Sequence, residues 1–335
     1  MMGIELTVRP YQRRFIKPFY TAHGLWIWRE GLLIRLRDSL GRVGYGEVAP
    51  IPWFGSEAVE QAQAFCAAQG GEWRSEPVPD GLPATQFGFG CALEDLYRKE
   101  GQGDAAIAGQ EPAIADLCGL LPAGQAALGI VSQRLSQGYS TLKWKIGVFP
   151  FEQEMLWLQA LWAQLPPATQ LRLDANGGLD LAQAEQWLAV CDGINQRARS
   201  ATIEHLEQPL PPDQVETMAE LGQRYRTAIA LDESVATLVQ LETCWAQGWR
   251  GVVVVKPAIA GPPQRLQAFC LAHRPRLVFS SVFETPVGRR AALALAGRCA
   301  CAPTLAPGPA LGFGTQGCFD DDWDTLTPPE LWNQV

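Results

Sequence analysis

The sequence has few of the features that mark secreted, membrane-bound or nucleic-acid-binding proteins. Its first ten residues, MMGIELTVRP, contain no basic segment followed by an apolar core, and no later stretch reaches the roughly 18 uncharged apolar residues of a membrane span. The net charge is −8 and the 27 basic residues are scattered, which argues against a surface that binds phosphates. We therefore expect a cytoplasmic protein with no membrane partner and no nucleic-acid partner.

Cysteine and glycine motifs are also missing. The nine cysteines include no CxxC pair and no histidine at zinc-ligand spacing, so we expect reduced thiols, with Cys299 and Cys301 in packing roles. Neither GxGxxG nor GxxxxGKS/T occurs, although a doubly wound sheet usually carries such a phosphate loop after its first strand. The composition, 47% hydrophobic and 19% charged in 335 residues, is that of a globular chain with room for a barrel and a second small domain.

The pattern of residues 1–112 predicts an α+β domain. Three short segments are typical of strands, and two later ones have apolar residues at helical spacing. Ser56 precedes Glu57 and an apolar face, so we expect it to be the N-cap of the first helix. The expected strands are Ile4–Val8, Gly31–Arg37 and Gly44–Val48, and the expected helices are Ser56–Gln69 and about Leu82–Lys99.

Residues 113–304 alternate between short apolar strands and amphipathic helices. Successive strand ends from Lys145 to Ser280 are 24 to 33 residues apart, close to the roughly 31 residues of a β/α barrel unit. Residues 305–335 are rich in Pro, Gly and Asp, and we expect them to pack back on the first domain. The expected strand ends are Cys118, Lys145, Asp174, Glu207, Asp232, Lys256 and Ser280, with helices such as Phe151–Leu165, Leu181–Cys191 and Pro262–His273 between them.

Two lysines lie two residues apart in one of these strands. On a strand, Lys143 and Lys145 point to the same side, which we expect to be the barrel interior. Lysine is rarely buried without a partner, and repulsion between the two lowers the pKa of at least one, towards the range in which a neutral amine acts as a base. The alternative is an edge strand with two solvated lysines.

Carboxylates end three consecutive predicted strands. Asp174, Glu207 and Asp232 follow apolar runs, and a barrel brings the carboxyl ends of its parallel strands together at the mouth, where barrel active sites lie. Three anions there repel one another unless a cation neutralises them, and oxygen ligands suit a hard ion such as Mg²⁺ or Mn²⁺. We therefore predict a metal site at these three residues.

Other interpretations of this region stay open. Asp174 begins Asp-Ala-Asn-Gly, which taken alone is a common turn sequence. Among the neighbours of the predicted ligands, Glu204 and Glu233 are expected to point away from the ligand-bearing face. His205 is expected to be a packed or hydrogen-bonded histidine.

The sixth and seventh predicted strands add polar groups to the same mouth. The β-branched run Val252–Val255 is typical of a strand buried on both faces, and it ends in a third lysine, Lys256, across the barrel from the first two. Lysines would then flank the metal from both sides. Ser280 and Ser281 end the next strand, where their hydroxyls could hold a substrate carboxylate; a plain turn is the alternative.

This combination resembles the enolase superfamily and, within it, the muconate-lactonizing-enzyme subgroup. The resemblance implies an α/β fold, a modified TIM-type (β/α)7β barrel with an N-terminal α+β capping domain, and Gly44–Pro50 is similar to the segment before the mobile loop of that domain. The positions that match the subgroup's Lys-x-Lys strand, metal ligands and sixth-strand lysine are Lys143 and Lys145, then Asp174, Glu207 and Asp232, and finally Lys256.

Within this subgroup, the short length of the chain and the segments Thr21–Gly24 and Ile51–Glu57 most resemble the o-succinylbenzoate synthase family. That resemblance implies a lyase that dehydrates 2-succinyl-6-hydroxy-2,4-cyclohexadiene-1-carboxylate in menaquinone or phylloquinone biosynthesis. It also implies lid loops near residues 17–24 and 50–57. The substrate contacts it implies are Thr21, His23, Trp53, Ser280, Ser281 and Glu284.

The resemblance also implies a role for each ionisable residue. Lys145 would remove the α-proton as general base and then, as an acid, deliver it to the departing hydroxyl. Lys143 would keep the pKa of Lys145 low, and Lys256 would stabilise the enolate from the opposite face. Mg²⁺ on the three carboxylates would bind the substrate carboxylate and offset the second negative charge.

The sequence departs from the family pattern at Gln208, where many relatives have a second Glu, and in residues 302–315. Two other functions stay open. An N-acylamino acid racemase or dipeptide epimerase would use Lys145 and Lys256 on opposite faces of the substrate, although residues 302–315 contain no Asp-x-Asp for a dipeptide ammonium. A non-catalytic barrel that only binds metal or ligand is the remaining alternative.

Overall fold

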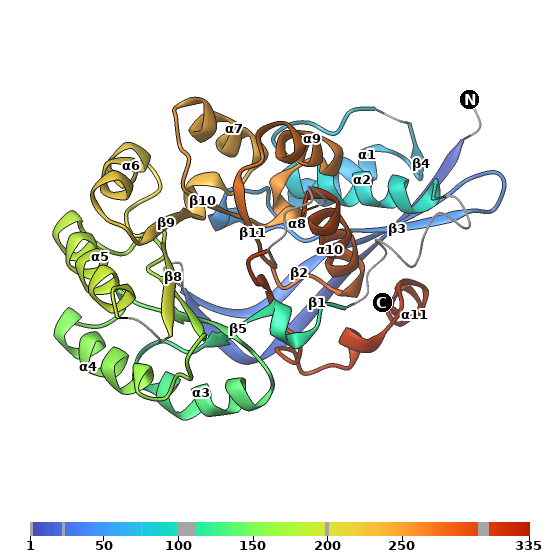
Figure 1. Cartoon of the computed structure of the whole chain (residues 1–335). Coiled ribbons are helices and arrows are strands. Elements are labelled where there is room, and N and C mark those ends of the chain that lie inside the picture. The colour runs from blue at the N-terminus through green and yellow to red at the C-terminus, as the bar shows by residue number, and fades with distance from the viewer. Residues whose placement is uncertain (1–2, 22–23, 75, 99–110, 198–200, 301–307) are drawn as a thin grey trace.

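The computed structural model describes residues 3–21, 24–74, 76–98, 111–197, 201–300 and 308–335. The chain forms an N-terminal part built on an antiparallel sheet and a larger part in which helices surround a ring of parallel strands (Figure 1). Within these ranges, no helix is both long and apolar enough to cross a membrane. The eight cysteines that the structure describes are free thiols, and Cys299 packs against the hydrophobic core, whereas Cys301 lies outside the described residues.

The N-terminal sheet is antiparallel throughout, with the strand order β3-β2-β1-β4. Alternate residues of the central strand face opposite ways: Leu32 and Ile34 belong to the main core with the helices, and Leu33 packs with Leu331 and Trp332 near the C-terminus. The elements of this part are β1 (Ile4–Thr21), β2 (Gly24–Arg37), β3 (Val43–Val48), the 3-10 helix η1 (Pro52–Phe54), α1 (Val59–Ala68), β4 (Glu72–Trp73) and α2 (Pro83–Leu96).

Several bounds differ from those predicted for residues 1–112. The first two strands are much longer and form one hairpin that is paired from Glu5 with Arg37 to Thr21 with Gly24. Most of the segment predicted to be a lid near residues 17–24 is therefore the end of β1. Ser56 is not an N-cap: α1 begins three residues later, and the Ser56 hydroxyl accepts a hydrogen bond from the backbone N–H of Ile51 instead.

Two glycines of β3 allow α2 to pack closely on the sheet. A Cβ atom added to Gly46 would lie 2.1 Å from the carbonyl oxygen of Gly88, and one added to Gly44 would lie 2.1 Å from that of Ala92. Neither position tolerates a side chain, because both contacts are with helix backbone. The Gly-Tyr-Gly part of the segment Gly44–Pro50 therefore sets the distance between helix and sheet.

The larger part is an eight-stranded parallel barrel, as predicted. Its strand order is β11-β10-β9-β8-β7-β6-β5-β12, and a bridge between Ser280 and Gly312 joins the two ends. Seven strands are followed by helices of the barrel, whereas the helix that follows β12 packs at the N-terminal sheet, which gives the (β/α)7β arrangement. The strands are β5 (Leu117–Leu121), β6 (Thr141–Lys145), β7 (Gln170–Asp174), β8 (Thr202–Glu207), β9 (Ala228–Leu231), β10 (Val252–Val255), β11 (Arg276–Phe279) and β12 (Leu311–Gly314).

The barrel helices bury their apolar residues against the outer face of the strands. Leu142 and Trp144 of β6, for example, are fully buried in the main core, whereas Lys143 and Lys145, which alternate with them, face the inside of the barrel. The helices are α3 (Ala127–Ser136), α4 (Phe151–Trp162), α5 (Leu181–Asn195), α6 (Val215–Arg224), α7 (Leu238–Ala246), α8 (Pro257–Ala260), α9 (Pro263–His273) and α10 (Pro286–Ala300).

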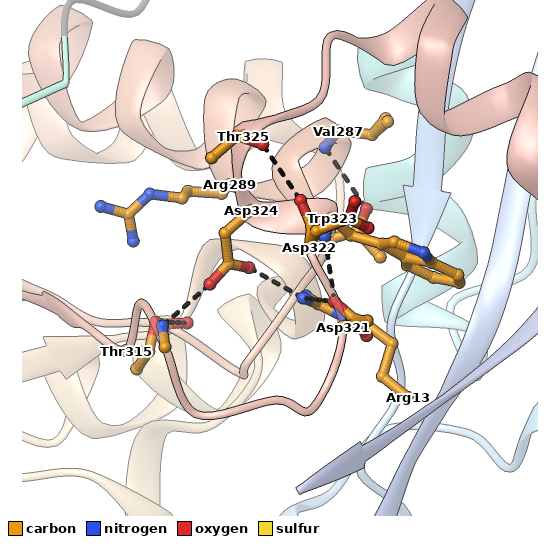
Figure 2. A network of polar contacts seen from close by, with 12 residues as sticks. Arg13, Val287, Arg289, Thr315, Asp321, Asp322, Trp323, Asp324 and Thr325 are labelled. Carbon is orange, nitrogen blue, oxygen red and sulfur yellow. Dashed lines mark hydrogen bonds and ion pairs between the residues drawn. The ribbon is translucent and has the colours of Figure 1, made fainter. Parts of the chain in front are cut away.

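The C-terminal residues lie along the hairpin of the N-terminal sheet, with α11 (Pro328–Gln334) beside it in Figure 1. Ile16 donates a backbone hydrogen bond to the carbonyl oxygen of Cys318, and Phe15 forms a bridge with Phe319. Figure 2 shows the buried guanidinium of Arg13 held by Asp321 and Asp324, at 2.6 and 2.8 Å. The first strand and the last residues of the chain are thus one packing unit.

Glu47 connects the N-terminal sheet to the barrel. Its fully buried carboxylate accepts hydrogen bonds from the hydroxyl of Tyr11 and from the backbone N–H and hydroxyl of Thr285. It also accepts the N–H of Gly288, 2.8 Å away, in the first turn of α10. Free N–H groups and the dipole make a helix N-terminus a favourable place for an anion, so one carboxylate fixes this helix to the sheet.

Candidate active site

Five strands of the barrel bring the predicted ionisable residues to one end. Lys145 pairs with Asp174, and Asp174 pairs with Glu207, because β6, β7 and β8 are parallel neighbours that end in register. Asp232 directly follows β9 and Lys256 directly follows β10. Asp174, Glu207 and Asp232 are all buried. The structure therefore gathers all six residues at the carboxyl ends of consecutive strands.

Lys143 lies between two of the carboxylates. Its ammonium nitrogen is 2.7 Å from Asp174 Oδ2 and 2.7 Å from Glu207 Oε1. Burial disfavours the charged amine, but Asp174 and Glu207 outweigh it and raise the pKa of Lys143 well above its ordinary value. Burial likewise opposes ionisation of Glu207, yet Lys143 holds the pKa of that carboxyl well below its usual range. Lys143 is thus a fixed cation and not the lysine of lowered pKa.

Lys256 stands on the opposite side of the ring, since β10 and β6 are four strands apart in the eight-stranded order. Its ammonium group forms an ion pair with Asp232. Phe54, from the N-terminal part, places its ring centroid 3.9 Å from the same nitrogen. A cation over an aromatic face is attracted by the ring quadrupole, so the segment that follows β3 contacts this lysine directly.

Lys145 differs from the other two lysines. It is partly exposed, and in the part of the chain that the structure describes no carboxylate forms an ion pair with it. Because it is two residues from Lys143 on β6, it lies on the same face, one step nearer the mouth. Its amine is therefore available to a bound substrate.

Two polar residues that follow β7 and β9 were not predicted to belong to the site. Asn176 donates its backbone N–H to Asp174 Oδ1, at 2.9 Å, and its side-chain amide to Glu233 Oε1, at 3.0 Å. The prediction that Glu233 points away from the ligands is therefore wrong. Burial, and then the charge of Asp174, raise the pKa of Glu233.

Glu204 was also predicted to point away from the ligand face, and this too is wrong. The register between β7 and β8 shifts between Leu171 and Arg172, so Glu204 is an extra residue in its strand. Its carboxylate accepts a hydrogen bond from Arg172 Nε at 2.7 Å, and Arg172 is on the same face as Asp174. An ion pair thus fills the barrel below the site.

His205 and Gln208 are buried supports of the carboxylates. Burial lowers the pKa of His205, whose Nε2 lies 3.7 Å from Glu207 Oε2, so the packed histidine is neutral. The amide oxygen of Gln208 accepts the N–H of Asp232 at 2.9 Å, and its amide nitrogen donates to the hydroxyl of Ser234 at 2.8 Å. A glutamate at this position would lack that donor.

The predicted substrate contacts are placed unevenly. The Ser281 hydroxyl donates to Glu284 at 2.8 Å, so these two buried residues bind each other, while Ser280 lies at the bridge to Gly312. Trp53 is half-exposed and packs edge-on against Trp26 at 5.2 Å. The structure describes only the backbone of Thr21, and His23 lies outside the described residues.

The donor set fits a divalent metal in its chemistry. Asp174, Glu207 and Asp232 are buried carboxylates, and hard oxygen ligands of this kind suit Mg²⁺. Among the described residues no three His, Cys, Asp or Glu side chains are placed closely enough together to hold an ion, and the ammonium groups of Lys143 and Lys256 lie against these carboxylates. The lysines thus supply positive charge where the carboxylates converge.

Comparison with known proteins gives the family. A family model described as "Enolase C-terminal domain-like" matches residues 128–325, and one described as "MenC, N-terminal domain" matches residues 25–96. The chain is 39% identical to the o-succinylbenzoate synthase of Thermosynechococcus vestitus, over 98% of both chains. It is 30% identical to that of Klebsiella pneumoniae, over 78% of this chain and 76% of the relative.

Solved structures agree with this result. The o-succinylbenzoate synthase of Thermosynechococcus elongatus, with Mg in its active site, superposes with a TM-score of 0.85 and 38% identity over 99% of this chain and 100% of that one. The L-Ala-D/L-Glu epimerase of Bacillus subtilis shares the fold, with a TM-score of 0.72 and 19% identity over 96% of this chain and 92% of that one. The chain is a member of the enolase superfamily and belongs, within it, to the o-succinylbenzoate synthase family.

Proposed function

We propose that this protein is an o-succinylbenzoate synthase, a lyase that dehydrates 2-succinyl-6-hydroxy-2,4-cyclohexadiene-1-carboxylate in menaquinone or phylloquinone biosynthesis. The observation that carries the proposal is the meeting of three buried carboxylates and three lysines at the mouth of one barrel. Removal of a proton next to a carboxylate requires a base and a cationic environment for the developing enolate. The site contains both.

Lys145 is the proposed general base. It lies on the inner face of β6 and has no carboxylate partner among the described residues, so its amine can reach the α-carbon of a substrate at the mouth. The protonated amine then delivers the same proton to the departing hydroxyl, which makes the elimination a syn process. Lys143, two residues earlier on the same face of the strand, keeps a fixed positive charge beside the base through its ion pairs with Asp174 and Glu207.

Lys256 is the proposed cation on the opposite face of the substrate. It follows β10, across the ring from β6, and the ring of Phe54, a residue of the N-terminal part, lies against its ammonium group. Asp174, Glu207 and Asp232 would hold Mg²⁺, or Mn²⁺, whose charge when bound stabilises the substrate carboxylate and the enolate. Thr21, His23, Trp53, Ser280, Ser281 and Glu284 remain the proposed substrate contacts.

The domain division and location are also part of the proposal. Residues 1–112 would form the capping domain with lids near 17–24 and 50–57, residues 113–304 the catalytic barrel, and residues 305–335 the segment that packs back. The contact of Phe54 with Lys256 supports a role for the second lid. Free thiols at the eight described cysteines are consistent with a reducing compartment such as the cytoplasm.

An ultraviolet assay of aromatisation tests this function. The purified protein with Mg²⁺ should convert the cyclohexadiene substrate to the aromatic product, and a chelator should reduce the rate to background until Mg²⁺ is added back. A metal-loaded protein that neither dehydrates this substrate nor exchanges the α-proton of any carboxylate would instead be a non-catalytic binding barrel.

Racemisation of N-acylamino acids is a second candidate. Lys145 and Lys256 face each other across the ring, an arrangement in which one lysine removes a proton from one face and the other returns it to the opposite face. Exchange of the α-proton of N-acylamino acids with solvent deuterium, followed by proton NMR, tests this activity directly. Exchange in the absence of aromatisation would favour the racemase.

A further inference from the structure

Arg29, on β2, is a buried arginine whose hydrogen bonds within the described residues all go to backbone carbonyls. The residue is only 2% exposed, and its Nε donates a hydrogen bond to the carbonyl oxygen of Val282 at 2.9 Å. One terminal nitrogen donates to Pro50, at 2.9 Å, and to Glu30, at 2.7 Å, and the other donates to Ala49. A single guanidinium thus joins a strand of the sheet to two separate loops.

The partner of Arg29 across the hairpin shows how unusual this set of acceptors is. Arg13 pairs directly with Arg29 in the register of β1 and β2, and it is equally buried, at 1% exposure. Two carboxylates, Asp321 and Asp324, neutralise Arg13, as Figure 2 shows. In the described ranges no carboxylate forms an ion pair with Arg29. Its charge therefore faces carbonyl dipoles and the ring of Trp26, whose centroid is 5.8 Å from the guanidinium carbon, an arrangement that depends on the loops staying in place.

One of the loops that Arg29 binds contacts the candidate site, and the other carries proposed substrate contacts. Ala49 and Pro50 follow β3 and lead into η1, whose last residue, Phe54, lies against Lys256. Val282 follows β11 between the paired residues Ser281 and Glu284. The guanidinium is therefore attached to the loop beside the proposed enolate-stabilising lysine and to the loop of the proposed substrate contacts.

An aromatic contact reinforces the same two loops. Trp26, three residues before Arg29 on β2, packs edge-on against Trp53 of the first loop, with ring centroids 5.2 Å apart. It also packs edge-on against Phe283 of the second, with ring centroids 5.6 Å apart. Phe283 has a positive φ of 61°, which a phenylalanine adopts only when its surroundings hold it there.

We propose that Arg29 is a positioning residue for catalysis, which holds the loop of residues 49–55 and the loop of residues 281–284 in the arrangement that places Phe54 on Lys256. This inference rests on the proposed function for its catalytic consequence. The planar guanidinium makes these four hydrogen bonds from three separate nitrogens, whereas lysine has a single nitrogen with three N–H groups and cannot reach all four carbonyls. Lysine should therefore not replace it.

Three variants test the proposal. Arg29→Lys keeps the charge, Arg29→Ala removes the side chain, and Arg13→Lys is the matched control at the paired position of the hairpin. We expect Arg29→Lys to lower kcat/KM by at least about tenfold, with a fall in kcat as well as a rise in KM, because small displacements of reacting groups are costly. We expect Arg13→Lys to change kcat/KM by less than about threefold, since a lysine can still pair with a carboxylate.

Chemical rescue separates positioning from a loss of folding. Guanidinium at a low, non-denaturing concentration should restore part of the kcat/KM of Arg29→Ala, and urea at the same concentration should not. If Arg29→Ala does not fold, Arg29→Lys decides the question by its kinetics. Wild-type kcat and KM in Arg29→Lys would overturn the proposal.

Hydrogen exchange gives a readout that does not depend on activity. The backbone amides of Phe54 and Gly55 donate to the carbonyls of Ile51 and Pro52. These amides should exchange faster in Arg29→Lys than in wild type, and their exchange rates should not change in Arg13→Lys. If wild type does not aromatise the substrate but this difference appears, the proposed function fails and the role in holding the loops stands. Equal exchange in all three proteins would overturn that role.

Discussion

Each ammonium group at the barrel mouth has different neighbours. Lys143 contacts two carboxylates, Lys256 contacts a carboxylate and an aromatic ring, and Lys145 contacts neither among the described residues. Although all three are lysines, Lys143 is thus a fixed cation, Lys256 an oriented cation and Lys145 an amine without a described ion pair. This division of environments is the physical basis for giving them different roles.

Lys145→Ala should abolish turnover without loss of stability. Loss of a general base typically lowers a rate by about 10²- to 10⁴-fold, and the residue makes no described ion pair whose loss would destabilise the barrel. Steady-state aromatisation kinetics and thermal unfolding measure the two effects, with Arg37→Ala at an exposed site as the control. Turnover above a tenth of wild type would rule out the role of base.

Glu284 should make stability depend on pH. Burial raises the pKa of this carboxyl, and the hydrogen bonds from Ser281 and Val282 only partly offset it. The folded state therefore binds the proton more tightly than the unfolded state does. The resulting stabilisation is complete below the ordinary glutamate pKa of about 4.3 and is lost as the pH rises through the raised value.

The variant Glu284→Gln measures this contribution. Free energies of unfolding in urea, taken between pH 4 and pH 8, should show wild type losing stability relative to the variant as the pH rises. The exposed Glu152→Gln is the control and should show no such trend. A gap between wild type and Glu284→Gln that does not vary with pH contradicts the expectation.

Residue type and position at the strand ends were enough to predict that these six residues meet at one end of the barrel. Successive side chains of a strand face opposite sides, so the positions of Lys143, Asp174 and Glu207 along their strands fix the direction of their side chains. The local pattern was misleading at Glu204 and Glu233, because a register shift and a turn redirect their side chains. The predicted lid near residues 50–57 includes Phe54, but neither its contact with Lys256 nor the hydrogen bonds of Arg29 could be predicted, since both join residues far apart in the chain.

Barrel strands were predicted more accurately than the hairpin of the N-terminal sheet. Apolar runs such as Val252–Val255 end at charged residues, which marks the carboxyl ends of β6 to β10. The first barrel strand, predicted to end near Cys118, lacks such a residue and ends at Leu121. In β1 and β2, by contrast, Arg13 and Arg29 look like loop residues in the sequence but are buried in the sheet by partners far along the chain. Hydrophobic pattern alone does not identify a strand whose buried positions are charged.

Alanine should have opposite effects at two glycines, one where α2 packs on β3 and one on the exposed face of α3. Gly46→Ala would place a methyl group 2.1 Å from the carbonyl of Gly88, and the resulting shift should cost about 1–3 kcal/mol of stability. Gly129→Ala, in the exposed middle of α3 with no atom near the added Cβ, should instead gain about 0.5–1 kcal/mol. Urea denaturation compares the two, and equal stabilities would refute the packing argument.

The barrel and the N-terminal sheet are joined by more than apolar packing. Glu47 accepts hydrogen bonds from several buried donors of both parts. Burial, and then the negative charge of Glu47, raise the pKa of Tyr11 well above its ordinary value, so the phenol stays protonated and donates. The sequence predicted both parts but not this connection. Nothing in the order of residues shows that the glutamate of Gly-Tyr-Gly-Glu meets Gly288 of a helix, 241 positions later.

Glu47→Ala should therefore destabilise the entire protein. Hydrogen bonds to charged groups contribute about 1.5–3 kcal/mol each, so the loss of this acceptor should cost at least about 3 kcal/mol in urea unfolding. Glu30→Ala, which removes an exposed carboxylate bound only to Gln12 in the described structure, should cost less than about 0.5 kcal/mol. A small effect of Glu47→Ala would show that the two parts are held by apolar packing alone.

The junction between β1 and the C-terminal residues has a consequence for protein synthesis. Arg13 and Asp321 are 308 positions apart, so at about 5–20 residues per second a ribosome needs about 15–60 s to make the second after the first. During that interval the guanidinium of Arg13 has neither of its carboxylates and Phe15 lacks its bridge to Phe319. The first strand to emerge from the ribosome is therefore among the last to be completed.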